Sequence, residues 1–376
     1  MTDTATPVIL AKPGILFRSI PGNGMVGIKV GDNGLPLPLF PNFVVLPGVL
    51  LNRLDRIAST YWYPPPDHLQ ALSGLEWIIN GVTDADEYRS ALISLDDGFG
   101  EKAPIFNHPR AIAMTRRDIS SRLLQGIPGL TVPKCVRFAP VASSDFQKVF
   151  AAEGFRYPVL VRPCTSQTAH DLVRVNSPLD WAKVLRTPWI GKPHFMTQFV
   201  DFRADTGKFV RIRVAFVGAQ MILRGYTEQD DWLIRRAWGD APTVADIELF
   251  LDEVARFPAW TALHDVCREV MARGRLDFWG IDVGMVSRTE FVLFEANAAM
   301  SILDPYGTAP EVMAKVEPYF AALTQEVGTL LEAPTAWLHD ARLFPPVRDA
   351  LADPIRKDAT ERARVLDEGF VLGMRM

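Results

Sequence analysis

The stretch from Leu276 to Asn297, LDFWGIDVGMVSRTEFVLFEAN, constrains the fold more than any other part of the sequence. It has the pattern of two apolar strands joined by a polar turn, yet Asp282, Glu295 and Asn297 stand among its aromatic and aliphatic residues. A carboxylate in so apolar a run is costly to bury unless it is paired or binds a metal ion. The stretch therefore predicts that the two acids serve either an ion pair or a binding site.

The spacing of these polar residues predicts that they converge. Glu295 and Asn297 are two residues apart on an expected strand, so their side chains leave the same face of a sheet. Asp282 lies at about the same depth on the neighbouring strand if the two strands form a hairpin. Oxygen donors without His or Cys favour a hard cation, and Mg²⁺ carrying nucleotide phosphates is the expected guest. The spacing alone leaves an alternative open, in which Glu295 pairs with an arginine and Asn297 caps a turn.

Composition limits the kinds of partner that we expect. The chain of 376 residues is long enough for two or three domains, and its formal charge of -4 gives no general attraction to nucleic acid or to anionic lipid. Three widely separated cysteines suggest neither a disulfide framework nor a metal site, and fit a reducing, cytoplasmic setting. No apolar run reaches the roughly 18 residues of a membrane span. We expect a cytoplasmic protein that binds neither nucleic acid nor membrane.

Hydrophobic periodicity predicts a mixed α and β chain. Residues 1 to about 60 are rich in Gly and Pro, and no helix is expected there. Helices are expected at residues 84–95, 111–124, 144–153, 245–271 with a break at Pro258, and 310–331. Strands are expected at residues 75–80, 131–138, 157–163, 172–175, 195–200, 209–217 and 221–225. Beyond Ala333, prolines and alternating charges predict a surface appendage.

GIDVGMVSRTEFVLFEAN resembles the hallmark of the ATP-grasp superfamily, in which an Asp on one strand and a Glu-x-Asn on the next hold Mg²⁺ against the ATP phosphates. Three further pieces resemble family segments and occur in the family's order: IFNHPRAIAMTRRDISSRLLQGIPGLTVP, YPVLVRP and MTQFVDFRADTGKFVRIRVAFVG. Together they cover roughly residues 77 to 305. Their order and spacing make the sum more specific than any one piece. The similarity is to carboxylate-amine ligases such as the ribosomal-protein glutamate ligase and glutathione synthetase-like members.

The resemblance implies an α+β architecture, the ATP-grasp fold, in which two α/β lobes clasp the nucleotide after an α/β preATP-grasp domain. The implied divisions are a preATP-grasp-like domain at residues 1–105 and a small nucleotide-binding lobe at 106–195. A large lobe with the metal site would follow at 196–332, and a C-terminal appendage at 333–376.

The resemblance also implies roles for individual residues. The metal ligands would be Asp282, Glu295 and Asn297. Arg162 would replace the usual strand-end lysine, and either Arg116 or Arg117 would be the first basic residue. The hinge that lines adenine would be Gln198, Phe199 and Val200, with Asp201 or Asp205 accepting from the ribose hydroxyls. Arg213, with Arg211 as its rival, would face the acyl phosphate, and the pair Arg235 and Arg236 would hold a substrate carboxylate. For each arginine, a surface or interstrand salt bridge is the alternative.

One departure from the family pattern concerns the loop after Arg162. Relatives have a glycine-rich flap over the phosphates, whereas residues 164–171, CTSQTAHD, contain no glycine. Close approach of backbone amides to phosphate is easiest without a Cβ atom. Either the hydroxyls of Thr165, Ser166 and Thr168 or the ring of His170 contact the phosphates instead, or the flap is weakened and catalysis is slow or lost.

The expected function is an ATP- and Mg²⁺-dependent ligase that joins a small-molecule carboxylate to an amine, with an amino acid or short peptide among its substrates. Covalent catalysis by the protein is not indicated: the sequence has no GxSxG motif, and the one cysteine near a histidine, Cys267 after His264, has the spacing of a helix core. The alternative is a nucleotide-binding module with little or no catalysis that acts as a scaffold or regulator, and a kinase-like phosphotransferase is a third reading. A homodimer is left open as the assembly state.

Overall fold

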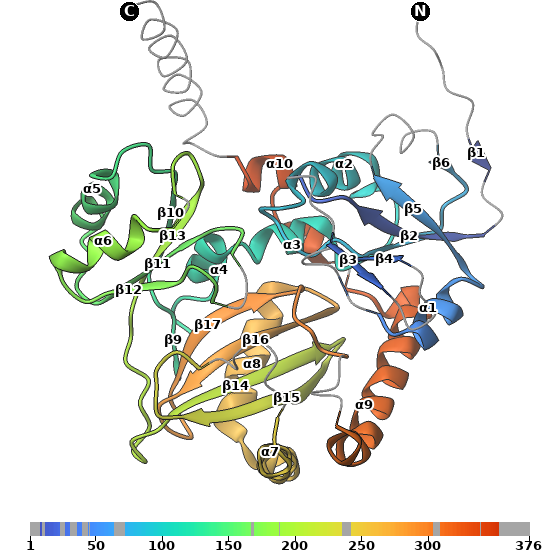
Figure 1. The fold of residues 1–376 in the computed structure, drawn as a ribbon. Helices are drawn as coiled ribbons and strands as arrows, with labels where there is room; N and C mark the ends of the chain where they lie inside the picture. The colour runs from blue at the N-terminus through green and yellow to red at the C-terminus, as the bar shows by residue number, and fades with distance from the viewer. Residues whose placement is uncertain are drawn as a thin grey trace, which may run out of the picture. The chain divides into compact units, whose positions relative to one another are not determined.

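The computed structural model describes residues 8–9, 12–22, 27–30, 36–39, 44, 46–63, 72–166, 169–187, 189–234, 242–303, 309–338 and 340–352. The chain forms two compact units, unit 1 with Met1–Val132 and Asp201–Ala350, and unit 2 with Pro133–Val200 and Leu351–Met376. Helices and several separate sheets occur within the described ranges, which confirms the predicted α+β class (Figure 1). Of the helices in the described part of the chain, none is long and apolar enough to cross a membrane.

Unit 1 begins with a parallel sheet in the order β5-β2-β7-β8. Its strands are β2 (Gly14–Ser19), β5 (Ala58–Tyr63), β7 (Trp77–Asn80) and β8 (Ile105–Phe106), and α2 (Arg89–Phe99) connects the last two. Parallel strands are typically buried on both faces, and Ile15, Phe17 and Ile78 are at most 1% exposed. Short two-stranded pairs, β1 (Val8–Ile9) with β6 (Leu72–Ser73) and β3 (Gly27–Val30) with β4 (Pro36–Leu39), lie outside this sheet.

The expectation that residues 1–60 lack a helix is wrong, because α1 spans Gly48–Leu54. Leu50 and Leu54 are four residues apart, so they lie on one side of the helix, and both are buried in the main core of unit 1. The Gly and Pro content of the surrounding region obscured this short amphipathic segment, which depends on tertiary burial more than on local propensity.

The second sheet of unit 1 has the order β15-β14-β16-β17-β9. Its strands are β14 (Phe209–Val217), β15 (Gln220–Gln229), β16 (Phe278–Met285), β17 (Phe291–Asn297) and β9 (Leu130–Thr131), and only β9 runs parallel to its neighbour. Figure 1 shows α8 (Thr261–Gly274) behind this sheet. Trp279 packs against Gly274 of that helix, so the face bearing Trp279 and Ile281 is the one covered by α8. The opposite face bears Asp282.

Two helix breaks shape this unit. The predicted break at Pro258 is confirmed, because α7 (Val244–Arg256) ends before a 3₁₀ turn at Phe257–Ala259 and α8 follows. The single helix expected at residues 111–124 is wrong: α3 (Pro109–Met114) and α4 (Arg117–Leu123) are separated where Arg116 adopts ψ 129°. The second break makes Arg117 the first residue of α4.

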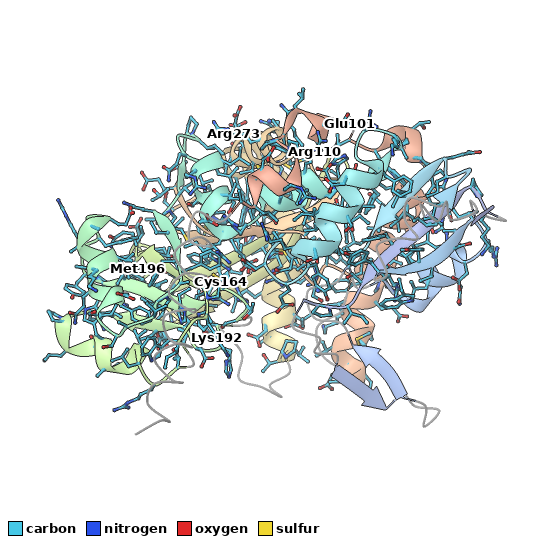
Figure 2. The ribbon with its side chains drawn as sticks, turned by 90° about the horizontal axis from the view of Figure 1, so that it is seen from above. Glu101, Arg110, Cys164, Lys192, Met196 and Arg273 are labelled. Carbon is cyan, nitrogen blue, oxygen red and sulfur yellow. The ribbon has the colours of Figure 1, made fainter. Side chains whose placement is uncertain are left out.

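The C-terminal part of unit 1 packs into its core. After α9 (Pro310–Leu331), the indole of Trp337 is 3% exposed and meets Trp77 and Phe106 edge-on, at centroid distances of 5.9 and 5.5 Å. The backbone N–H of Val347, the first residue of α10 (Val347–Ala350), donates to Asp96. Asp96 also forms an ion pair with Arg110, and Arg110 forms a second ion pair with Glu101. Arg110 and Glu101 are labelled in Figure 2. The described residues beyond Ala333 therefore contribute buried contacts and do not form a purely superficial tail.

The described part of unit 2 has an antiparallel sheet in the order β10-β13-β11-β12 and two short α-helices. The strands are β10 (Cys135–Phe138), β11 (Val159–Pro163), β12 (Val173–Val175) and β13 (His194–Gln198), and the helices are α5 (Asp145–Ala152) and α6 (Trp181–Val184). Phe138, Phe146 and Trp181 form the centre of its aromatic core. Met196 belongs to this core, and Cys164, the residue after β11, is buried in a small cluster with Cys135 and Phe195; Met196 and Cys164 are labelled in Figure 2.

Candidate functional site

The hairpin of β16 and β17 brings the two predicted acids together. The strands pair antiparallel, with Asp282 directly opposite Glu295 and Gly280 opposite Asn297. Directly opposed residues project from the same face with Cβ atoms about 5 Å apart. Asn297 shares that face because it lies two residues beyond Glu295. The hairpin predicted from the sequence is confirmed, and the three oxygen-bearing side chains lie on one face of it.

A one-residue register shift sets which side chain faces Asp282. From the turn, Met285 pairs with Phe291 and Val283 with Leu293, and this register would bring Phe294 opposite Asp282. The shift between Asp282 and Val283 leaves Phe294 as the extra residue of a β-bulge and brings Glu295 opposite Asp282. The bulge thus accommodates Phe294 while the two carboxylates stand opposite each other.

Arg213 holds Asp282 from the other side. It pairs with Asp282 across β14 and β16, and its Nε and Nη2 atoms each lie 2.7 Å from a carboxylate oxygen. The two side chains are 21% and 7% exposed. Burial acts to raise the pKa of Asp282, but the guanidinium of Arg213, with weaker help from Arg211 and Arg117, outweighs it and holds the pKa below its usual range. Asp282 is therefore a buried carboxylate that remains charged at neutral pH.

Arg117 holds Glu295 in the same way. Its Nη2 atom lies 2.6 Å from Oε2 of Glu295, and its Nη1 atom donates to the backbone carbonyl oxygen of the bulge residue Phe294. Arg116 instead forms an ion pair with Asp118 at 2.7 Å, at the start of α4. Of the two arginines that the sequence offered as alternatives, the structure brings Arg117 to the acids, whereas Arg116, just before α4, pairs with Asp118 in the first turn of that helix.

Asn297 carries a side-chain acceptor that no described residue satisfies. Its Nδ2 atom donates to Oε1 of Glu295 at 3.0 Å, while its Oδ1 atom is buried and has no hydrogen-bond partner among the residues described. Buried polar atoms are nearly always hydrogen-bonded, and an unmade bond costs about 1–3 kcal/mol. This oxygen, beside two carboxylates, is therefore available to accept a bond from a ligand atom or to coordinate a cation.

The donor set fits a hard divalent cation, such as Mg²⁺. Asp282, Glu295 and Oδ1 of Asn297 supply carboxylate and amide oxygens, the ligand chemistry that Mg²⁺ prefers. Within the described ranges no group of three His, Cys, Asp or Glu side chains gathers, so the set reaches three only through the amide. Two protein carboxylates with several positions left for water and phosphate oxygens are typical of Mg²⁺ bound together with a nucleotide.

The charge around the acids is positive in sum. Arg211 pairs with Gly284, two positions along from the Arg213 and Asp282 pair, so it lies on the same face. Its Nη1 atom donates to the carbonyl oxygen of Ile234 at 3.1 Å. Three guanidinium groups against two carboxylates leave one net positive charge. Farther along the same face the residues are apolar and belong to the main core, for example Val217 opposite Phe278.

The base of β16 is anchored by a polar network that the sequence did not reveal. Asp277 accepts from the backbone N–H groups of Asn107 at 2.7 Å and Leu338 at 2.6 Å, and Asn107 Oδ1 accepts from the N–H groups of Asp277 and Phe278. Burial raises the pKa of Asp277 to about 7, partly offset by these hydrogen bonds. Asn107 has φ +50°, a left-handed conformation that Asn tolerates. The Asn-His-Pro sequence at the start of α3, residues 107–109, is the sequence feature that could have indicated this helix start. The network fixes the start of α3 against β16.

Several predicted nucleotide-binding residues lie in unit 2. Arg162 donates to the carbonyl oxygen of Ser166, and the Ser166 hydroxyl donates to that of His170. The amide of Gln198 bonds to the carbonyl oxygens of Arg156 at 2.9 Å and Pro158 at 3.0 Å, so it holds the loop before β11. The described part of the glycine-free loop is thus held by bonds within itself.

The remaining predicted residues are variously placed. The ring of Phe199 is covered by the Arg174 guanidinium at 3.8 Å, and Val200 is half-buried at the end of unit 2. Asp201 accepts from the N–H of Arg203 at 3.1 Å, and Asp205 is exposed in the following turn. The predicted substrate-binding pair, Arg235 and Arg236, lies outside the described residues.

No family model matches the sequence, and no curated protein matches it. Among solved structures, the chain is similar to a RimK-domain ATP-grasp protein from Sphaerobacter thermophilus, at 13% identity over 84% of this chain and 99% of that one, with a TM-score of 0.46. It is also similar to the VanG D-Ala:D-Ser ligase from Enterococcus faecalis, at 14% identity over 69% and 73% of the two chains and a TM-score of 0.42. The carboxyaminoimidazole ribonucleotide synthase from Aspergillus clavatus, solved with ATP, has 13% identity over 76% and 70% and a TM-score of 0.43. Similarities of this size leave the activity of this chain to be argued from its own residues.

Proposed function

We propose that the chain is an ATP- and Mg²⁺-dependent carboxylate-amine ligase of the ATP-grasp type. The observation that carries the proposal is the cluster on β14, β16 and β17, in which Asp282 faces Glu295, and Asn297 presents a buried oxygen without a partner in the described part of the chain. A purely structural ion-pair network has no need for that unsatisfied oxygen. A cation bound between the acids and the amide would satisfy it.

Charge supports an anionic ligand beside the cation. The three guanidinium groups of Arg117, Arg211 and Arg213 outnumber the two carboxylates, so a cation alone would add to an excess of positive charge. A triphosphate would reverse that balance. Residues 133–200 contain nine Lys and Arg against four Asp and Glu, a net charge of +5 in a chain whose total is -4. This local excess suits phosphate binding, with Arg162, Ser166 and the hinge residues Gln198, Phe199 and Val200 as the proposed contacts.

The proposed reaction has two steps. A substrate carboxylate oxygen attacks the γ-phosphorus of ATP, the bond to the β-phosphate oxygen breaks, and ADP leaves. The amine nitrogen of the second substrate then attacks the carbonyl carbon of the acyl phosphate, inorganic phosphate leaves, and the nitrogen loses a proton to give the amide. Bound Mg²⁺ would neutralise phosphate charge during the first step. Arg213 and Arg211 would offset the charge that grows on the transferred group, because guanidinium groups form two parallel bonds with phosphate oxygens.

The amine or carboxylate substrate is proposed to bind near the segment after Ile234. Arg211 bonds to the carbonyl oxygen of Ile234, immediately before the proposed substrate-binding residues Arg235 and Arg236. An amino acid or short peptide, with a carboxylate for such a pair, is the substrate class that we propose.

A nucleotide-binding scaffold with little catalysis is the second candidate. Both acids are already held by arginines, and the loop after Arg162 is held by its own hydrogen bonds and lacks glycine. These observations favour slow turnover over the loss of nucleotide binding. The two candidates differ in product formation and agree on Mg²⁺-dependent binding.

The proposal is tested by phosphate release from ATP and Mg²⁺ across a panel of amino acids and short peptides, with mass spectrometry of the products. Asp282→Asn and Glu295→Gln should each reduce Mg²⁺-dependent ATP binding, measured by calorimetry, by at least about tenfold. Glu290→Gln is the matched control, because Glu290 is exposed on the turn of the same hairpin. ATP binding with no product under any combination would favour the scaffold. ATP binding that neither Asp282→Asn nor Glu295→Gln weakens would refute the assigned ligands.

A further inference from the structure

We infer that Arg213 acts as a built-in counter-ion that keeps the cation site closed until a phosphate-bearing ligand arrives. Cation and anion then bind together, and a divalent cation alone binds poorly. The inference rests on the proposed function and adds an order of events to it. Arg213 is the side chain proposed to contact the transferred phosphate. When no phosphate is bound, Arg213 pairs with Asp282 and keeps this proposed ligand from the metal ion.

The hydrogen bonds at the two acids carry this inference. Both oxygens of Asp282 accept from the guanidinium of Arg213. Oε2 of Glu295 accepts from Arg117, and Oε1 accepts from the amide of Asn297. All four carboxylate oxygens are thus engaged by donors of the protein itself. A cation that approaches Asp282 alone would have to compete with the charged guanidinium of Arg213 for both carboxylate oxygens.

The geometry also indicates what would release Arg213 from Asp282. Its guanidinium bonds to Asp282 through two parallel N–H groups at 2.7 Å each, the arrangement that a phosphate group accepts equally well. Arg213 is 21% exposed and Asp282 only 7%, so the arginine is the partner that an arriving anion can reach. An anion that takes the guanidinium frees Asp282, and the freed carboxylate then attracts the cation.

The coupling is reciprocal by thermodynamic necessity. If the anion strengthens cation binding by some factor, the cation strengthens anion binding by the same factor. Removing the guanidinium of Arg213 should therefore free Asp282 as a bound anion would, and the cation should then bind without any anion. A charge-assisted pair of hydrogen bonds is worth roughly 10-fold to 100-fold in affinity.

The test measures binding of Mn²⁺ alone to the full chain, by the loss of the free-ion signal in electron paramagnetic resonance. The wild-type chain should bind Mn²⁺ weakly, and Arg213→Gln should bind it at least about tenfold more tightly. Arg213→Lys keeps the charge without the two parallel bonds and should fall between them. Arg53→Gln is the matched control: Arg53 forms a two-bond ion pair with Glu332, between α1 and α9 of the same unit, and its loss should leave Mn²⁺ affinity unchanged.

A second measurement uses only the wild-type chain. At equal ionic strength, sulfate should tighten Mn²⁺ binding relative to chloride, because sulfate can accept the two parallel N–H groups of Arg213. Tight Mn²⁺ binding by the wild-type chain in chloride, or equal affinities for wild type and Arg213→Gln, would overturn the inference and leave the proposed function standing. Failure of a non-hydrolysable ATP analogue to bind with Mg²⁺ would instead overturn the proposed function.

Discussion

The ion pair between Arg213 and Asp282 can be measured by a double-mutant cycle with Asp282→Asn and Arg213→Gln. Each single change leaves one charged partner at a site where the side chains are 21% and 7% exposed. Removing one partner of a buried pair costs about 3–5 kcal/mol, because the other charge stays buried without compensation. Arg213 retains some access to water, so Asp282→Asn should cost about 2–4 kcal/mol, and Arg213→Gln, which leaves the more buried carboxylate, about 3–5 kcal/mol.

The double variant carries neither charge and should be less destabilised than the sum of the two single variants by about 2 kcal/mol. Equilibrium urea unfolding of the full chain, followed by circular dichroism and by tryptophan fluorescence, gives the free energies of unfolding. A coupling energy below about 0.5 kcal/mol would show that the two side chains act independently and would refute the pairing argument.

The same cycle has a predicted pH dependence. The pKa of Asp282 is lowered in the folded chain, relative to 3.8 for an ordinary Asp. A lowered pKa means that this group stabilises the fold above its unfolded pKa, and that the contribution is lost as the pH falls through the folded pKa. The stability gap between wild type and Asp282→Asn should therefore be constant from neutral pH down to about 4 and should narrow below it.

Three further outcomes are expected. Asn297→Ala should lower Mg²⁺-dependent ATP affinity about tenfold by calorimetry while changing the free energy of unfolding by less than about 1 kcal/mol, because removing an oxygen that has no partner in the described chain offsets the lost hydrogen bond to Glu295. The pKa of Asp277 is raised to about 7, so its stabilising contribution is full below the unfolded pKa of 3.8 and is lost as the pH rises to 7. The destabilisation by Asp277→Asn should therefore be smaller in urea unfolding at about pH 8 than at about pH 5. Trp337→Ala should cost about 3–5 kcal/mol in the same assay, against less than about 1 kcal/mol for the neighbouring, partly exposed Leu338→Ala, and equal effects would contradict the packing described.

Strand pattern predicted the hairpin of the candidate site well, because two apolar runs joined by a polar turn, around Asp282 and Glu295, are a local property of the sequence. The limits of β14 and α9 were also predicted as the structure has them, at Phe209–Val217 and Pro310–Leu331. Helix α1 was missed because a seven-residue helix is stabilised by what it packs against, which local composition does not contain.

The ion pairs of the candidate site could not be predicted from the sequence, because they depend on the tertiary structure. Arg117 and Glu295 are 178 residues apart, and no local pattern selects Arg117 over its neighbour Arg116. The break between α3 and α4, which makes that selection, arises at an ordinary arginine with no Pro or Gly to signal it. The open alternative that Glu295 pairs with an arginine is what the structure shows, and the role of the acids as metal ligands remains a prediction.

The bulge at Phe294 makes two properties of the hairpin independent of each other. One is the opposition of Asp282 and Glu295, and the other is the hydrogen bond from Arg117. If Phe294 were deleted, Glu295 would follow Leu293 and would still stand across from Asp282, so the opposition of the carboxylates does not require the extra residue. What the extra residue supplies is a main-chain oxygen turned toward Arg117. A change of chain length at this single position would thus alter the hydrogen bonding of Arg117 and leave Asp282 and Glu295 opposite each other.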